Sequence, residues 1–213
     1  MINGTAATPH DAHRGHTVHY DPVAGKIGMW LFLFTEVLLF GTLFIAFAVY
    51  LQKYHFEFRE ASGHLDKLAG AANTVILLTS SLTMALSIAV LERAKKGLSL
   101  LLLTITILCA LAFLGIKSVE WGEKFAHDIY PKSATMLQKP VGEQVFYGLY
   151  FTMTGLHALH VIIGAAFIMF AMVLVKTERT RAERINFLQN TGLYWHLVDL
   201  VWILLFPLFY LIG

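Results

Sequence analysis

The sequence has little charge for its length. Of its 213 residues only 14% are Asp, Glu, Lys or Arg, whereas 57% are hydrophobic. A typical soluble domain has about 25% charged and about 45–50% apolar residues. The few charges also gather in short segments between long uncharged runs. This distribution excludes an ordinary soluble domain and predicts a membrane protein, because a charged side chain at the bilayer centre costs at least ~2.5–3.5 kcal/mol.

Cysteine is almost absent, and several recognisable sequence features are missing altogether. Cys109 is the single cysteine, which excludes an internal disulfide and a cysteine-rich metal site. Residues 1–21 lack the apolar stretch of a signal peptide, so we expect the first transmembrane helix to lead membrane insertion. No Gly-rich phosphate loop, nucleophile elbow or paired-carboxylate hydrolase site is present, and nothing indicates nucleic acid as a partner.

Five apolar runs are long enough to cross a membrane as helices, which takes about 20 residues at 1.5 Å each. No run contains an internal proline before Pro207, near the end of the last one. We therefore predict an all-α integral membrane bundle of five transmembrane helices in residues 26–213, preceded by a polar tail in residues 1–25. The predicted spans are Ile27–Leu51, Ala69–Leu91, Leu98–Ile116 or slightly beyond, Val145–Val175 and Phe187–Ile212.

Lysine and arginine are unevenly distributed among the connecting segments. Glu92–Lys96 and Lys176–Arg184 each carry a net charge of +2, whereas Gln52–Leu68 and Lys117–Gln144 are longer and charge-balanced. Short basic loops remain on the cytoplasmic side of a membrane. The pattern predicts a cytoplasmic N-terminus and an outside C-terminus. The absence of a targeting sequence favours the cytoplasmic membrane of a bacterium.

Ionisable residues inside predicted spans are candidate functional residues, because their placement is costly and requires partners. Glu36 lies about ten residues into the first span, where it could serve as a proton relay, contact lipid headgroups or a polar network, or be a neutral carboxyl bonded to a neighbouring helix. His157 and His160 share one helix face, as do His196 and Asp199, since each pair is three residues apart.

Two interpretations of these histidines remain open. Contact between the two pairs across helices would make His157, His160, His196 and Asp199 an intramembrane polar network. Alternatively, His157 and His196 could be the axial ligands of a b-type haem.

The tail carries four histidines at three-residue spacing, which could bind a divalent metal if the tail were helical. Glycine and proline in the same segment favour a cytoplasmic arm without stable helix instead. The four are His10, His13, His16 and His19.

Three of the predicted helices resemble helices of subunit III of the haem-copper respiratory oxidases. The segments are Gly28–Tyr50, Phe146–Phe167 and Tyr194–Leu211, which occur in the family's order, and Asn73–Ser81 and Ser118–Phe125 add looser matches. The residues that carry the match are Glu36, Gly155, His157, His160, Val161, Trp195, His196, Asp199 and Trp202.

This resemblance implies an accessory subunit with no catalytic residue and no metal of its own. Subunit III of the family packs against subunit I, which reduces oxygen with haem and copper, and it holds phospholipid and supports assembly and proton uptake. The resemblance thus implies subunits I and II and membrane lipids as partners in a proton-translocating terminal oxidase, most simply a cytochrome c oxidase. Glu36 would face subunit I or lipid, and the histidines and Asp199 would be structural.

The sequence departs from the family in two places. Many members have seven helices, and the first two are missing here. Gln189 and Asn190 stand where members often have an acid.

Alternative functions are the accessory subunit of a quinol oxidase or of a nitric oxide reductase, or a free-standing b-type cytochrome. The sequence of this chain determines neither the electron donor nor the haem types of the complex.

Overall fold

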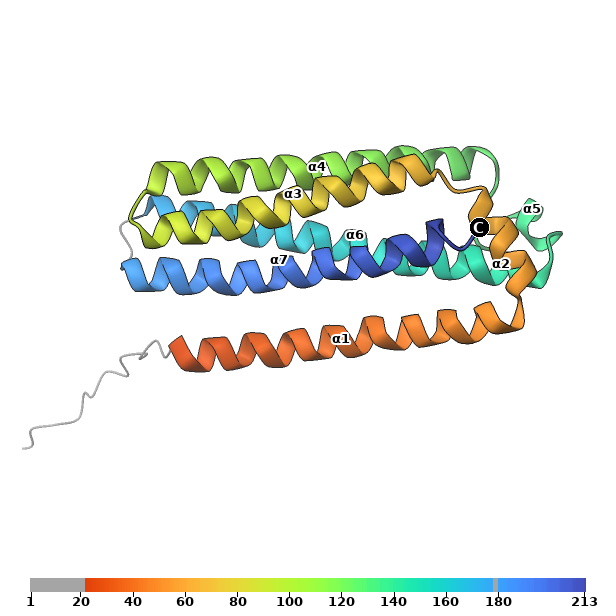
Figure 1. The fold of residues 1–213 in the computed structure, drawn as a ribbon, viewed down its shortest axis with the longest axis horizontal. Helices are drawn as coiled ribbons and strands as arrows, with labels where there is room; N and C mark the ends of the chain where they lie inside the picture. The colour runs from red at the N-terminus through yellow and green to blue at the C-terminus, as the bar shows by residue number, and fades with distance from the viewer. Residues whose placement is uncertain (1–21, 178–179) are drawn as a thin grey trace, which may run out of the picture.

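The computed structural model describes residues 22–177 and 180–213, and within these ranges it has α-helices and no β-strand. Five helices, α1, α3, α4, α6 and α7, are long and apolar enough to cross a membrane, so the predicted all-α fold with five transmembrane helices is confirmed. The helices are α1 (Pro22–Lys53), α2 (His55–Gly63), α3 (Lys67–Glu92), α4 (Lys96–Ala126), α5 (Ala134–Leu137), α6 (Val141–Lys176) and α7 (Arg181–Tyr210) (Figure 1).

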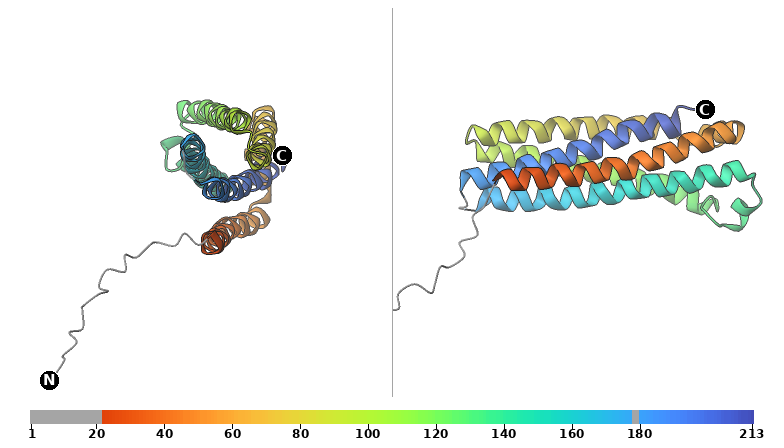
Figure 2. Two further views of the ribbon diagram at one scale, coloured as in Figure 1. Left: turned by 90° about the vertical axis from the view of Figure 1, so that its left-hand side faces the viewer. Right: turned by 90° about the horizontal axis from the view of Figure 1, so that it is seen from below.

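Four of the long helices, α3, α4, α6 and α7, form a bundle, and α1 lies outside it, against α6 and α7 (Figure 2). The short helices α2 and α5 lie together with the C-terminus at one end of the bundle, called here the cap end (Figure 1). The opposite end, where the turn of residues 93–95 joins α3 to α4, is called the basic end.

Side-chain caps and a tight turn set the helix boundaries at both ends. At the cap end the Asp66 carboxylate accepts hydrogen bonds from the backbone N–H groups of Leu68 and Ala69, at 2.9 and 3.1 Å, and so begins α3. At the basic end Ala94 has φ of 60°, which lets α4 fold back directly on α3.

Small residues and aromatic rings pack the helices closely. A Cβ added at Gly164 of α6 would lie 2.7 Å from the Trp195 ring of α7, so glycine is needed for this approach of the two helices. Near the cap end Phe47 of α1 meets Phe58 of α2 and Phe209 of α7 edge to face, at centroid distances of 5.3 and 5.0 Å. This aromatic cluster attaches α1 to the bundle.

The cap-end segments are more helical than predicted. The segment predicted as a loop, Gln52–Leu68, contains α2, and the predicted loop Lys117–Gln144 contains the last turns of α4, which continue from Ile116 to Ala126, and also α5. The prediction treated every charged residue as part of a loop, whereas Lys117 and Glu120 in the last turns of α4 are paired and buried, as described below. Helix α1 also begins earlier than predicted, at Pro22.

The division into a tail of residues 1–25 and a membrane domain of residues 26–213 stays a prediction, as does the orientation. The four tail histidines, at positions 10, 13, 16 and 19, lie outside the described residues.

Candidate functional site

Glu36 and His160 form a pair that joins α1 to α6. The Nε2 atom of His160 lies 2.9 Å from Oε2 of Glu36, and both side chains are largely buried. The other ring nitrogen, Nδ1, lies 2.7 Å from the Leu156 carbonyl oxygen. Because a carbonyl only accepts, Nδ1 must carry a proton, and the carboxyl and Nε2 therefore share one further proton between them. The structure thus brings Glu36 to a histidine on a neighbouring helix.

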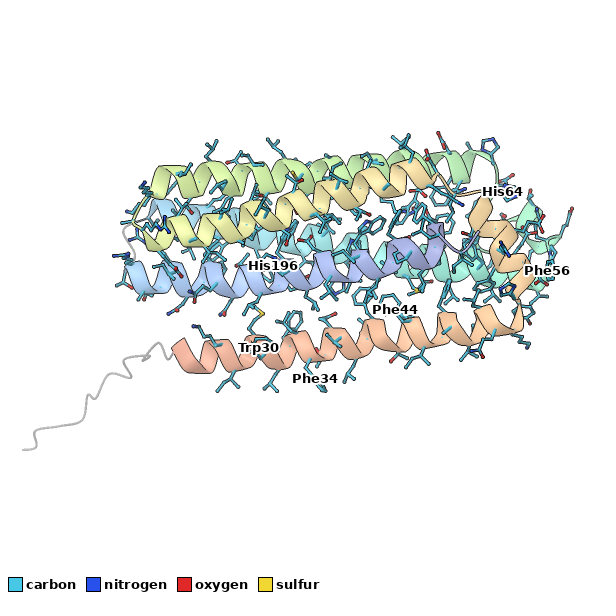
Figure 3. All side chains as sticks on the ribbon, in the orientation of Figure 1. Trp30, Phe34, Phe44, Phe56, His64 and His196 are labelled. Carbon is cyan, nitrogen blue, oxygen red and sulfur yellow. The ribbon has the colours of Figure 1, made fainter. Side chains whose placement is uncertain are left out.

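Much of the α1 surface on either side of this pair is apolar and exposed. Trp30, Phe34 and Ile45 are among the exposed large side chains of α1, and Figure 3 shows Phe34 on the side away from the bundle. Phe44 instead lies between α1 and α7 (Figure 3). The pair therefore provides a polar contact for a helix that otherwise presents apolar side chains.

His196 and Asp199 share a face of α7 but lie in different environments. His196 of α7 lies with Nδ1 at 2.7 Å from the Ser81 hydroxyl of α3. Asp199, one turn further along α7, is 3% exposed, and neither carboxyl oxygen has a hydrogen-bond partner among the described residues.

His157 occupies the centre of the bundle. Its ring is fully buried and lies 5.4 Å from the Phe113 ring and 5.3 Å from the Trp202 ring, centroid to centroid. Neither ring nitrogen has a hydrogen-bond partner among the described residues. The hydrogen bonds of the described part of the chain thus pair His160 with Glu36 and His196 with Ser81, and do not join His157, His160, His196 and Asp199 to one another.

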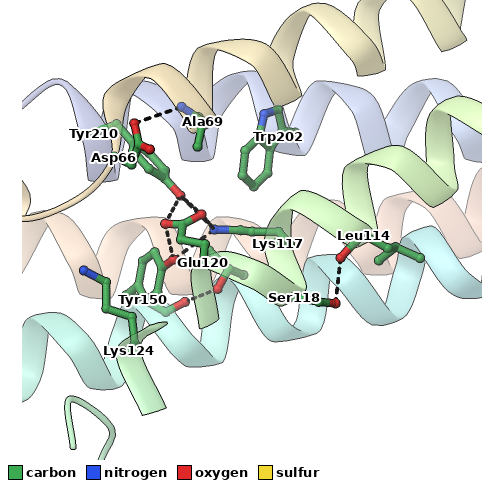
Figure 4. A network of polar contacts seen from close by, with 12 residues as sticks. Asp66, Ala69, Leu114, Lys117, Ser118, Glu120, Lys124, Tyr150, Trp202 and Tyr210 are labelled. Atoms are coloured by element: carbon green, nitrogen blue, oxygen red, sulfur yellow. Dashed lines mark hydrogen bonds and ion pairs between the residues drawn. The ribbon is translucent and has the colours of Figure 1, made fainter. Parts of the chain in front are cut away.

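A buried ion pair near the cap end was not foreseen from the sequence. The Lys117 ammonium donates to Glu120 at 3.0 Å, to the Tyr150 hydroxyl at 3.0 Å and to the Tyr210 hydroxyl at 2.7 Å. Both tyrosine hydroxyls donate to Glu120, at 2.6 and 2.7 Å (Figure 4). Lys117 is 2% and Glu120 6% exposed. This ion-pair cluster of Lys117, Glu120, Tyr150 and Tyr210 ties α4, α6 and α7 together.

The spacing of buried residues along α4 was the signal that could have revealed this cluster. They follow one another at alternating intervals of four and three residues, the repeat of a helix packed on one face. Lys117 and Glu120 continue that repeat beyond the apolar run. Their position on the packed face of the helix therefore predicts that they are buried, although their charge alone would predict exposure. The buried residues of α4 are Ser99, Leu103, Thr106, Ala110, Phe113, Lys117 and Glu120.

Comparison with known proteins identifies relatives over almost the whole chain. The family described as cytochrome c oxidase subunit III matches residues 10–213. The cytochrome bo(3) ubiquinol oxidase subunit 3 of Pseudomonas aeruginosa is 27% identical over 100% of this chain and 97% of the relative. The quinol oxidase subunit 3 of Bacillus spizizenii is 28% identical over 92% of both chains. A haem-copper oxidase subunit I+III of Aeropyrum pernix is 30% identical over 93% of this chain and 24% of its own length.

Proposed function

Because the chain belongs to the cytochrome c oxidase subunit III family and is subunit III of a haem-copper oxidase, we propose that its complex oxidises quinol. The support is that the relatives from Pseudomonas aeruginosa and Bacillus spizizenii, which align with 100% and 92% of this chain, are named as quinol oxidase subunits. The sequence-based preference for a cytochrome c oxidase is not confirmed by these comparisons.

The chain is a multi-pass membrane protein that takes part in a terminal oxidase without a redox centre of its own. Subunit III of this family has none, and the described residues contain no group of three or more His, Cys, Asp or Glu side chains that could hold a metal. The two histidines considered as haem ligands have other contacts: His157 packs between aromatic rings and His196 bonds with Ser81. We place haem and copper in the partner subunits.

The family implies association with subunit I, and the Aeropyrum pernix relative combines the two subunits in one chain. We propose that the exposed apolar surface of α1 meets subunit I or phospholipid and that the Glu36–His160 pair holds α1 in position for that contact. Further proposals are association with subunit II, support of proton-coupled oxygen reduction in subunit I, and a location in the bacterial cytoplasmic membrane.

Purification of the complex from its native membrane in mild detergent tests the proposed electron donor. We expect the chain to co-purify with a large haem-containing subunit and a subunit II without copper, and the complex to consume oxygen with a reduced quinol and not with reduced cytochrome c. A copper-bearing subunit II together with oxidation of cytochrome c would overturn the proposal while leaving the chain a subunit III.

A further inference from the structure

Three buried polar side chains in the bundle core have no hydrogen-bond partner among the described residues. They are Asn73 of α3, His157 of α6 and Asp199 of α7, which are 0%, 0% and 3% exposed. In each of them both polar atoms of the side chain are unpartnered. Other buried polar groups of the bundle, such as the Ser80 and Trp195 pair at 3.1 Å, do have partners.

The contacts of Trp202 place the three residues at about the same level of the bundle. Its ring packs against the His157 ring. Its indole N–H donates to the hydroxyl of Thr74, the residue after Asn73, at 3.1 Å. Asp199 precedes Trp202 by three residues and therefore lies one turn away on the same face of α7.

Leaving these atoms unpaired would be costly. A buried donor or acceptor without a partner costs about 1–3 kcal/mol, and lipid cannot supply the missing bonds. A buried water molecule makes about three hydrogen bonds and accompanies otherwise unsatisfied buried polar groups. One imidazole, one carboxyl group and one amide offer both donors and acceptors, which suits water.

The ion-pair cluster lies between this region and the surface of the cap end. The Lys117 ammonium is 5.3 Å from the centroid of the Trp202 ring, on the inner side of the cluster. On the outer side Glu120 lines a pocket of about 320 Å³ together with Asp66 and Glu123. Polar groups therefore continue from that pocket through Glu120 and Lys117 to the Trp202 region.

From this geometry we infer that the bundle core binds water molecules between Asn73, His157 and Asp199, and that this water exchanges with the solvent at the cap end by way of the ion-pair cluster. The inference goes beyond the proposed function and does not depend on the electron donor. It extends the predicted polar network, because bridging water would connect His157 and Asp199, which no direct hydrogen bond joins.

Thiol accessibility in the assembled complex tests this inference. With Cys109→Ala as the background, Asn73→Cys and Met84→Cys place a single thiol on the same face of α3, at two positions that are both 0% exposed. Met84 lies three turns nearer the basic end, where the neighbouring buried hydroxyls of Thr83 and Ser87 already have hydrogen-bond partners. Silver ions, small enough to follow water, are added in aqueous buffer, and the remaining thiol is measured with a fluorescent maleimide after denaturation. We expect silver to react at least 10-fold faster in Asn73→Cys, and similar rates in the two variants would overturn the inference.

A second measurement uses the parent complex and does not rely on a variant that folds. Electron cryo-microscopy at a resolution that reveals ordered water should show density within hydrogen-bond distance of at least two of the three side chains. Direct bonds among Asn73, His157 and Asp199, without solvent density between them, would refute the hydrated core.

Discussion

At His160 the hydrogen bond of one ring nitrogen determines which nitrogen is available to Glu36. Because Nδ1 of His160 is occupied by the Leu156 carbonyl, only Nε2 is available to Glu36. The pair can be a neutral carboxyl donating to a neutral imidazole, or an ion pair. Ions surrounded by hydrocarbon carry a desolvation penalty that their attraction repays only in excellent geometry, so we expect the neutral form.

Substitution of Glu36 distinguishes the two forms. In Glu36→Gln the amide can donate to Nε2 as the carboxyl did, so the stability of the assembled complex should change by less than ~1 kcal/mol. In Glu36→Ala the buried Nε2 loses its partner, which should cost about 1–3 kcal/mol. The measurement is the thermal midpoint at which the subunit dissociates from the purified complex. Equal losses in the two variants would show that the negative charge itself is required.

At the scale of the element, α4 is held at the cap end by charge and not by apolar contact alone. Its last turns carry the buried ion pair of Lys117 and Glu120, which the hydroxyls of Tyr150 and Tyr210 complete. Removing one member of a buried ion pair leaves an uncompensated charge and is far more costly than removing both.

We predict that Lys117→Met lowers the free energy of unfolding by about 3–5 kcal/mol. Adding Glu120→Gln to that variant should recover part of the loss, because a neutral amide can still accept from the tyrosines. Unfolding of the purified chain in mixed micelles with increasing denaturant measures the difference.

Glu123→Gln is the matched control, since Glu123 lies one turn further along α4 and is exposed. This variant should stay within ~0.5 kcal/mol of the parent. A double variant that is less stable than Lys117→Met alone would contradict the ion-pair explanation.

For the whole molecule, the arrangement of charge predicts the direction in which the bundle crosses the membrane. The basic end carries Arg93, Lys95 and Lys96 within a single turn, and such clusters remain cytoplasmic. We therefore expect the cap end, with α2 and α5, to face outward.

Single-cysteine labelling in spheroplasts measures this orientation. In the Cys109→Ala background, the exposed positions Ala134→Cys at the cap end and Lys96→Cys at the basic end are treated with a membrane-impermeant maleimide. Ala134→Cys should react in intact spheroplasts, and Lys96→Cys only after lysis. The reverse pattern would invert the orientation.

The sequence by itself determined the fold class and the family. Long uncharged runs can satisfy their backbone in hydrocarbon only as helices, and the motifs around Glu36, His157 and His196 occur in the order that subunit III shows. Hydropathy placed the middle of each span correctly, but it assigned Lys117 and Glu120 to a loop, because charge alone does not reveal that an acid and a base can neutralise each other inside a bundle.

Only the tertiary structure decided which polar groups meet. The i, i+3 spacings placed His157 with His160 and His196 with Asp199 on shared helix faces, yet a shared face does not fix the neighbour on another helix. Helix rotation and axial offset bring His160 to Glu36 and His196 to Ser81, and leave Asp199 without a direct partner among the described residues. The rotation and axial offset of each helix depend on close packing along its whole length, such as the contact of Gly164 with the Trp195 ring. No local run of residues encodes this rotation or offset.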